Sequence, residues 1–179
     1  MAGRLDLASL IRTVPDFPRA GVQFRDITTL RKDARGFRAV VDRLARAHRE
    51  ARVDKIAGIE SRGFIVGAAL AAAMRVGFVP IRKGGKLPAE NFGRDYALEY
   101  GRDRLEMHRD AIARGERVLV VDDLIATGGT AEAALALCDR AGAQVVGCAF
   151  VIDLPDLGGR ARLERAGVRT VALCAFRGS

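Results

Sequence analysis

Residues 55–83 read KIAGIESRGFIVGAALAAAMRVGFVPIRK and decide the fold class. Two short apolar runs, KIAGI at 55–59 and GFVPIR at 77–82, flank a longer apolar segment of helical length, GFIVGAALAAAMR at 63–75. Apolar strands without polar alternation are typical of a parallel sheet that is covered on both faces. The segment therefore predicts a strand, a helix and a second strand of a parallel sheet.

The same alternation of strands and helices continues towards the C-terminus. It is seen in RVLVV (117–121), GTAEAALALCDRAG (129–142), QVVGCAFVIDL (144–154), GGRARLERAG (158–167) and VRTVALC (168–174). We therefore predict a doubly wound α/β domain, in which ligands bind outside the carboxyl ends of the strands. The loops that follow KIAGI and RVLVV should then face one crevice.

The first 50 residues lie outside this alternation. From Leu7 to Val14 the apolar residues have the i, i+3, i+4, i+7 spacing of an amphipathic helix, which Pro15 ends. A loop-like segment with two phenylalanines follows, PDFPRAGVQFRDITTL at 15–30. A further apolar stripe predicts a second helix at about residues 34–50.

Residues 82–101, RKGGKLPAENFGRDYALEYG, do not fit the alternation. Glycine, proline and mixed polar residues stand where a helix would be expected, and about 20 residues with little regular structure inside a compact domain usually form a lid. Both tyrosines of the chain, Tyr96 and Tyr100, lie in this segment. We expect a lid loop that is partly extended near YALEY.

Composition narrows the range of partners. The 179 residues suffice for one domain with a sizeable core. The formal net charge is +8, yet basic and acidic residues are interspersed and no unbroken basic block of five or more occurs, so a nucleic-acid-binding tail is not expected. Lysine is rare in this arginine-rich chain, and two of its lysines, Lys83 and Lys86, stand together in RKGGK.

The cysteines and the apolar runs indicate a cytoplasmic protein. Cys138, Cys148 and Cys174 show no CxxC spacing and are interpreted as small buried hydrophobic residues of a reducing compartment. Charges interrupt the N-terminal MAGRLDLASLIRTV, and no later apolar run approaches the roughly 18 residues of a membrane span. We therefore expect no membrane association.

Residues 118–130, VLVVDDLIATGGT, carry the strongest functional signal. We expect the strand to end at Val121 and a helix to begin near Thr130, with unpaired backbone N–H groups of residues 126–130 pointing into the crevice. Such a helix N-terminus binds anions, and its glycines let the backbone approach the ligand. The hydroxyls of Thr127 and Thr130 can donate further hydrogen bonds. A phosphate group suits this loop.

The adjacent Asp122 and Asp123 would repel a phosphate that lay directly on them. They must serve another part of the same ligand, because carboxylates at a strand end commonly accept hydrogen bonds from ribose hydroxyls or approach Mg²⁺. The composite ligand is a ribose with a 5-phosphate. Walker A, GxGxxG and GxSxG motifs are absent, and an acidic receiver-like pocket would leave ATGGT unexplained.

Six motifs together resemble the type I phosphoribosyltransferase family, and within it the adenine-specific branch of bacteria. They follow the order and spacing of that family: FPRAGVQFRDIT (17–28), GIESRGFIVG (58–67), VPIRKGGKLP (79–88), YALEYG (96–101), VVDDLIATGGT (120–130) and FVIDLPDLGG (150–159). The resemblance implies Mg²⁺-dependent transfer of the 5-phosphoribosyl group from phosphoribosyl diphosphate to adenine, giving AMP and diphosphate. It also implies a homodimer of single-domain chains, each with a small N-terminal hood at about residues 1–33, a core at about 34–179 and a lid at about 82–101.

The resemblance further assigns roles to individual residues. The implied contacts are, for the 5-phosphate, Ala126, Thr127, Gly128, Gly129 and Thr130; for the ribose hydroxyls, Asp122 and Asp123; for the diphosphate, Arg62, Lys83 and Lys86; and for adenine, Gln23, Phe24 and Arg25. Phe24 would lie against the base, and the main chain on either side of it would read the edge of the base. Glu99 in YALEYG resembles the lid glutamate that contacts the attacking base and assists its proton movement.

Two other functions stay open at this point. A phosphoribosyltransferase for hypoxanthine, guanine or xanthine would share most of the motifs, although GVQFRDIT and YALEYG favour adenine. A regulator could keep the fold, bind phosphoribosyl diphosphate without catalysis and use its charge on DNA. Such regulators need a DNA-binding module, and the first 50 residues predict only one short helix, the hood and one longer helix.

Overall fold

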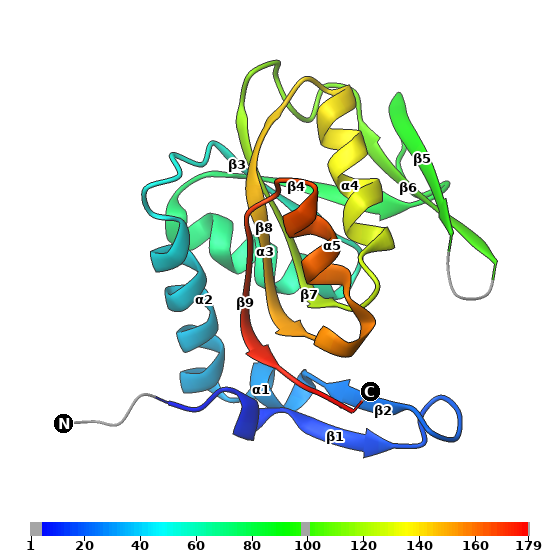
Figure 1. Cartoon of the computed structure of the whole chain (residues 1–179). Coiled ribbons are helices and arrows are strands. Elements are labelled where there is room, and N and C mark those ends of the chain that lie inside the picture. Colours follow the sequence, from blue (N-terminus) through cyan, green and yellow to red (C-terminus); the bar gives the residue numbers. More distant parts are fainter. Residues whose placement is uncertain (1–4, 98–100, 179) are drawn as a thin grey trace.

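The computed structural model describes residues 5–97 and 101–178 (Figure 1). Within these residues a central sheet of seven strands has the order β5-β6-β4-β3-β7-β8-β9. The strands are β3 (Lys55–Ile59), β4 (Gly77–Lys83), β5 (Asn91–Ala97), β6 (Arg102–His108), β7 (Arg117–Ile125), β8 (Gln144–Asp153) and β9 (Thr170–Ala175). The strands from β4 to β9 in that order are parallel, while β6 and β5 add an antiparallel edge. The predicted mainly parallel α/β fold is confirmed.

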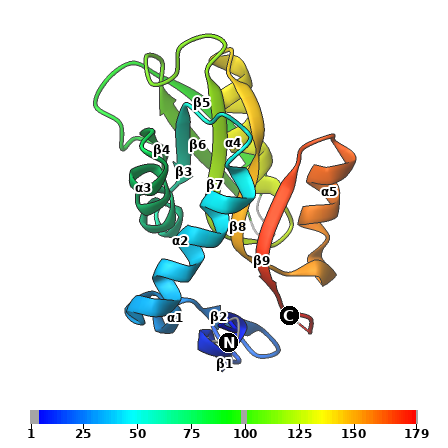
Figure 2. The ribbon, with the colours of Figure 1, turned by 90° about the vertical axis from the view of Figure 1, so that its left-hand side faces the viewer.

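Helices cover both faces of the sheet (Figures 1 and 2). One layer holds α2 (Ala34–His48) and α3 (Arg62–Met74), and the other holds α4 (Gly129–Arg140) and α5 (Gly159–Arg165), which follows the short 3-10 helix η2 (Pro155–Leu157). Along β7, Leu119 and Val121 face the first layer, whereas Val118 and Val120 face the second. Burial on both faces explains the unbroken apolar run of this strand. In the described part of the chain, the helices are too short or too polar to cross a membrane.

The hood contains a strand pair where a helix was expected. Its elements are the 3-10 helix η1 (Ala8–Leu10), β1 (Arg12–Pro15), β2 (Gln23–Asp26) and α1 (Thr28–Lys32). The predicted helix from Leu7 to Val14 is wrong, because residues 12–15 pair antiparallel with residues 23–26. The helical spacing arises because Leu7 and Ile11 are both buried in the core from the short turn that precedes β1. The second helix is present as α2.

The segment predicted as a lid is more regular than expected. Lys83 still belongs to β4, and β5 pairs with β6 from Asn91↔His108 to Ala97↔Arg102. The sequence of β6 gave no apolar run, because the strand lies in the antiparallel part of the sheet and buries only part of its surface, including Leu105 and Met107. Figure 1 shows this hairpin projecting at the side of the sheet, away from the hood. Residues 98–100 lie outside the described residues.

The loop after β7 is shorter than the sequence suggested. β7 continues beyond Val121 to Ile125, because Asp122 and Ile125 still pair with β8 at Phe150 and Asp153. The helix α4 then begins at Gly129, one residue earlier than expected. Only residues 126–128 connect the strand to the helix.

Candidate active site

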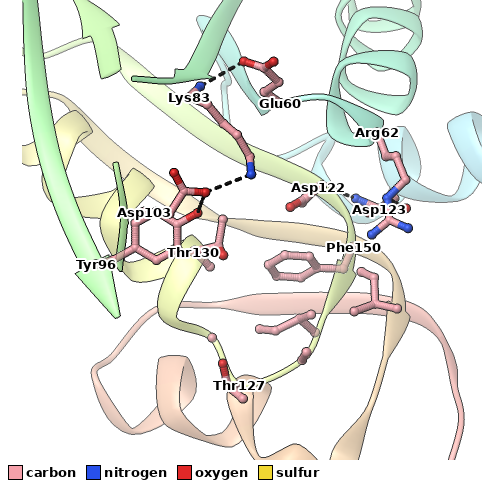
Figure 3. A pocket seen from close by; sticks show the side chains of 15 residues that line it. Glu60, Arg62, Lys83, Tyr96, Asp103, Asp122, Asp123, Thr127, Thr130 and Phe150 are labelled. Atoms are coloured by element: carbon pink, nitrogen blue, oxygen red, sulfur yellow. Dashed lines mark hydrogen bonds and ion pairs between the residues drawn. The ribbon is translucent and has the colours of Figure 1, made fainter. Parts of the chain in front are cut away.

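A cavity of ≈ 280 Å³ lies at the carboxyl ends of β3 and β7 (Figure 3). We call it the phosphoribosyl cavity. The two loops that were expected to share a crevice both contribute to its wall, through Glu60 and Arg62 after β3 and through residues 122–128 and 130 at the end of β7. Lys83, Tyr96 and Asp103 close the side nearest the β5–β6 hairpin.

The loop from Ala126 to Thr130 forms one end of this cavity. Ala126, Thr127, Gly128 and Thr130 line it, whereas Gly129 lines an adjoining cavity of ≈ 310 Å³. Gly128 adopts φ +89°, a left-handed conformation that favours glycine. The loop leads directly into the N-terminus of α4, where anions are favoured.

Gly159, the first residue of α5, supports this loop from behind. Its amide N–H donates to the Ala126 carbonyl at 2.9 Å. A Cβ atom at this position would lie 2.3 Å from that carbonyl oxygen and 2.7 Å from the Gly128 nitrogen. Only a glycine permits this close approach of α5 to the loop. The sequence indicated Gly159 solely as part of the motif FVIDLPDLGG.

The adjacent aspartates have different surroundings. Asp123 is 3% exposed, and its Oδ2 lies 3.2 Å from Arg31 Nη2 and 3.1 Å from Arg62 Nε. Asp122 receives the backbone N–H of Asp123 at 2.8 Å. Burial, followed by the negative charge of Asp123, raises the pKa of Asp122 well above its usual range. The two carboxyl groups thus differ in their contacts, because Asp123 pairs with two arginines whereas Asp122 accepts a backbone N–H.

The three predicted diphosphate-binding cations do not occupy equivalent positions. Arg62 and Lys83 line the phosphoribosyl cavity. Lys86 lies outside that wall and forms an ion pair of 2.5 Å with Glu60. Glu60 also accepts from the Lys83 backbone N–H at 2.9 Å and from Arg82 Nε at 3.2 Å. Burial raises the pKa of Glu60, but the hydrogen bonds from these basic residues outweigh it and lower the pKa overall.

A second cavity, of ≈ 590 Å³, lies under the hood. We call it the hood cavity. Residues 19–25 line it, among them Gln23, Phe24 and Arg25, which the resemblance assigns to adenine, and Leu154 and Leu157 contribute to the lining from another part of the chain. Arg62 and Leu124 line both this cavity and the phosphoribosyl cavity. The guanidinium carbon of Arg62 lies 5.9 Å from the centroid of the Phe24 ring.

The hood is joined to the C-terminal end of the sheet through Arg25. Its guanidinium lies over the Phe176 ring, 4.8 Å from the centroid, and Nη2 donates to the Arg177 carbonyl at 3.2 Å. In Figure 1 the arrowhead of β9 accordingly points at the hood. One wall of the hood cavity is therefore supported by residues from the far end of the chain.

Several residues of the site carry no signal that the sequence alone would reveal. Arg31 reaches Asp123 from α1, 92 positions earlier. Glu60 and Asp103 resemble ordinary surface acids in the sequence, and only the fold places them beside lysines. Glu99, the predicted catalytic residue, lies outside the described residues.

Comparison with known proteins agrees with this geometry. Residues 30–172 match the phosphoribosyl transferase domain family. The adenine phosphoribosyltransferase of Nitrosospira multiformis is 59% identical over 98% of this chain and 100% of the relative. The crystal structure of the Rhodothermus marinus adenine phosphoribosyltransferase superposes with a TM-score of 0.89, at 50% identity, covering 95% of this chain and 96% of the other.

A third relative was solved with ligands. The adenine phosphoribosyltransferase of Saccharomyces cerevisiae, complexed with an imino-altritol bisphosphate and adenine, has a TM-score of 0.88 and 40% identity, and the match covers 94% of this chain and 96% of the other. Similarity thus extends over nearly the whole of each chain and is not limited to the loop after β7. The chain belongs to the phosphoribosyltransferase family and, within it, to the adenine phosphoribosyltransferases.

Proposed function

We propose that the phosphoribosyl cavity and the hood cavity form one active site, in which a 5-phosphoribosyl group passes from phosphoribosyl diphosphate to adenine and yields AMP and diphosphate. The shared wall carries this proposal, because Arg62 and Leu124 border both cavities. A base under the hood and a sugar phosphate beyond Arg62 would then be adjacent. The yeast relative, whose complex holds adenine together with a bisphosphate, supports this arrangement.

We propose one orientation for the sugar phosphate in the phosphoribosyl cavity. The 5-phosphate belongs at residues 126–130, where a helix N-terminus and a glycine-rich turn favour an anion. The ribose hydroxyls then lie towards Asp122 and Asp123. We propose that Asp122 contacts them directly and that Asp123 combines this role with holding Arg62, to which it is already bound.

The diphosphate belongs at the opposite end, near Arg62 and Lys83, with Lys86 at the rim. We propose Mg²⁺ as the cofactor. No group of three or more His, Cys, Asp or Glu side chains able to hold a metal occurs in residues 5–97 and 101–178. Mg²⁺ keeps several waters and binds largely through substrate phosphates, so we propose that it would be held mainly by the diphosphate and ribose oxygens of phosphoribosyl diphosphate, with no residue of the chain assigned as a ligand. When bound, it offsets the negative charge of the leaving diphosphate.

The residues of the chain serve three tasks in the reaction. Departure of diphosphate builds positive charge on the ribose ring, as in glycoside cleavage, and negative charge on the leaving group. Fixed cations such as Arg62 and Lys83 stabilise the leaving group. The lid segment excludes water, and by the family resemblance Glu99 contacts the attacking base and assists its proton movement.

The base specificity is tested directly by offering four purines. We expect diphosphate release from phosphoribosyl diphosphate and Mg²⁺ with adenine, and none with guanine, hypoxanthine or xanthine. Omission of Mg²⁺ with a chelator is the matched control and should abolish the signal. Release with another purine instead of adenine would move the assignment to a different base, and binding of phosphoribosyl diphosphate without any release would favour the regulator.

We also propose a homodimer that uses the outer face of α3. Ile65 is 47% exposed there, and the neighbouring Ala68, Ala72 and Ala73 are exposed as well, so this helix presents an apolar surface. Light scattering should give twice the mass of the 19.2 kDa chain. Ile65→Arg should yield monomers, whereas Ala161→Arg on the exposed side of α5 should not. A monomeric unaltered protein would contradict the proposal.

The chain is further proposed to act as one domain in the cytoplasm, with the hood, core and lid limits given above. The free thiols of Cys138 and Cys148 are buried, and burial raises the pKa of each to about 12. Thiols that stay protonated at neutral pH are poor nucleophiles and suit a reducing compartment. Leu7 and Ile11 bury the hood against the core, which supports a single unit.

A further inference from the structure

Asp103, near the start of β6, places a carboxylate in the wall of the phosphoribosyl cavity beside the diphosphate cations. Its Oδ2 lies 2.8 Å from Lys83 Nζ, and the Tyr96 hydroxyl lies 3.3 Å from the same oxygen (Figure 3). The side chain of Asp103 is 22% exposed and that of Lys83 is 51% exposed. Lys83 therefore directs its charge at a protein carboxylate in this structure.

Asp103 also joins Lys83 to Tyr96 on the neighbouring strand. It is the direct cross-strand partner of Tyr96. The contacts run from Lys83 through Asp103 to Tyr96, and these residues come from β4, β6 and β5 (Figure 3). Tyr96 and Thr130 line the same cavity. Nearby Arg104 is engaged elsewhere, with Asp95 at 3.1 Å and Glu106 at 3.0 Å.

Both members of the Lys83–Asp103 pair are charged at neutral pH. The hydrogen bond between them lowers the pKa of the Asp103 carboxyl and raises the pKa of the Lys83 ammonium. A diphosphate that approaches the Lys83 ammonium group comes close to the negatively charged Asp103 carboxylate, which is already paired with that group. Like charges at such a distance disfavour each other, so the carboxylate and the diphosphate compete for Lys83.

We propose that Asp103 is a positioning residue. It forms an ion pair with Lys83 when diphosphate is absent, and this pair breaks when diphosphate binds to Lys83. The inference rests on the proposed function, because Lys83 receives its ligand there. Asp103 keeps the Lys83 side chain directed into the cavity of the free enzyme and lowers the affinity of the site for diphosphate. It thereby favours release of this product after transfer.

The test is Asp103→Asn, which removes the charge but keeps the size and the hydrogen-bonding capacity of the side chain. Because a partly exposed ion pair is modest in strength, we expect the Kd of Mg²⁺–diphosphate to fall by about three- to tenfold by calorimetry. Its product-inhibition constant should fall in parallel. The Kd of AMP, which carries no diphosphate, should stay unchanged and reports an intact fold. Asp103→Glu should restore weak diphosphate binding.

Asp95→Asn is the matched control, because it removes one negative charge from the same hairpin at a side chain that pairs with Arg104. It should leave diphosphate affinity unchanged. An equal rise in diphosphate affinity in both variants would mean that the overall charge alone explains the effect, and this would contradict the proposal. Unchanged or weaker diphosphate binding in Asp103→Asn would overturn it as well. Calorimetry with diphosphate needs no turnover. A wild-type enzyme that makes AMP while Asp103→Asn fails to tighten would therefore refute this inference and leave the proposed function intact.

Discussion

Gly159→Ala should lower kcat/KM for phosphoribosyl diphosphate by about 10²-fold or more, because displacement of binding groups by about 1 Å can have that effect. The new Cβ would lie 2.3 Å from the Ala126 carbonyl oxygen, and its other near neighbours are also backbone atoms of the loop. No flexible side chain can move aside. The loop itself must shift by roughly 1 Å to restore ordinary contact, and the N–H groups that face the 5-phosphate would shift with it.

Gly77→Ala provides the control for this substitution. A Cβ at Gly77 would meet only the flexible Lys55 side chain, at 3.4 Å. Steady-state kinetics should leave kcat/KM of this variant close to the wild-type value. Tm values of both variants, measured alongside, separate loss of the loop geometry from loss of the fold. A Gly159→Ala enzyme with wild-type kcat/KM would show that the loop does not hold the 5-phosphate.

Glu99→Gln should reduce kcat by about 10²-fold or more, which is the usual contribution of a positioned acid or base. The amide keeps the size of the side chain but cannot take part in proton movement at the base. Binding of phosphoribosyl diphosphate should stay nearly intact, because that ligand is assigned to Arg62, Lys83 and the loop after β7. The rate of AMP formation measures kcat, and calorimetry measures the binding of phosphoribosyl diphosphate.

Glu90→Gln is the comparison for Glu99→Gln. Glu90 lies in the same lid segment, but its side chain is 84% exposed and pairs with Arg109 at 3.4 Å. We expect kcat of this variant to stay within about twofold of wild type, as is usual for exposed ion pairs. Unchanged turnover in Glu99→Gln would reject the role that the family resemblance assigns to it.

The sequence predicted those parts of the fold in which the local pattern of apolar residues matches their burial in the structure. The β3–α3–β4 unit was readable because its strands are buried on both faces, so their residues are apolar without interruption. The strand β6 was not, since one face of a strand in the antiparallel part of the sheet stays polar. In the hood, the spacing of Leu7 and Ile11 resembled a helix, although the pairing of β1 with β2 decides the local structure.

The candidate site likewise contains residues that the sequence predicted and residues that it did not. The loop at residues 126–130 was recognisable because a strand end, glycines and a helix start follow one another along the chain. Contacts between distant segments were not recognisable, as with Arg31 at Asp123 or Gly159 behind the loop. These contacts depend on how the helices pack on the sheet, and a single sequence carries no local pattern for them.

The contact of Arg25 with Phe176 and Arg177 makes the hood cavity depend on residues up to 152 positions away along the chain. The loop at residues 126–130 has no such dependence, because Gly159 supports it from α5. Truncation before Phe176 should therefore affect the two cavities unequally. We expect a chain cut short just before Phe176 to bind ribose 5-phosphate better than it binds the base.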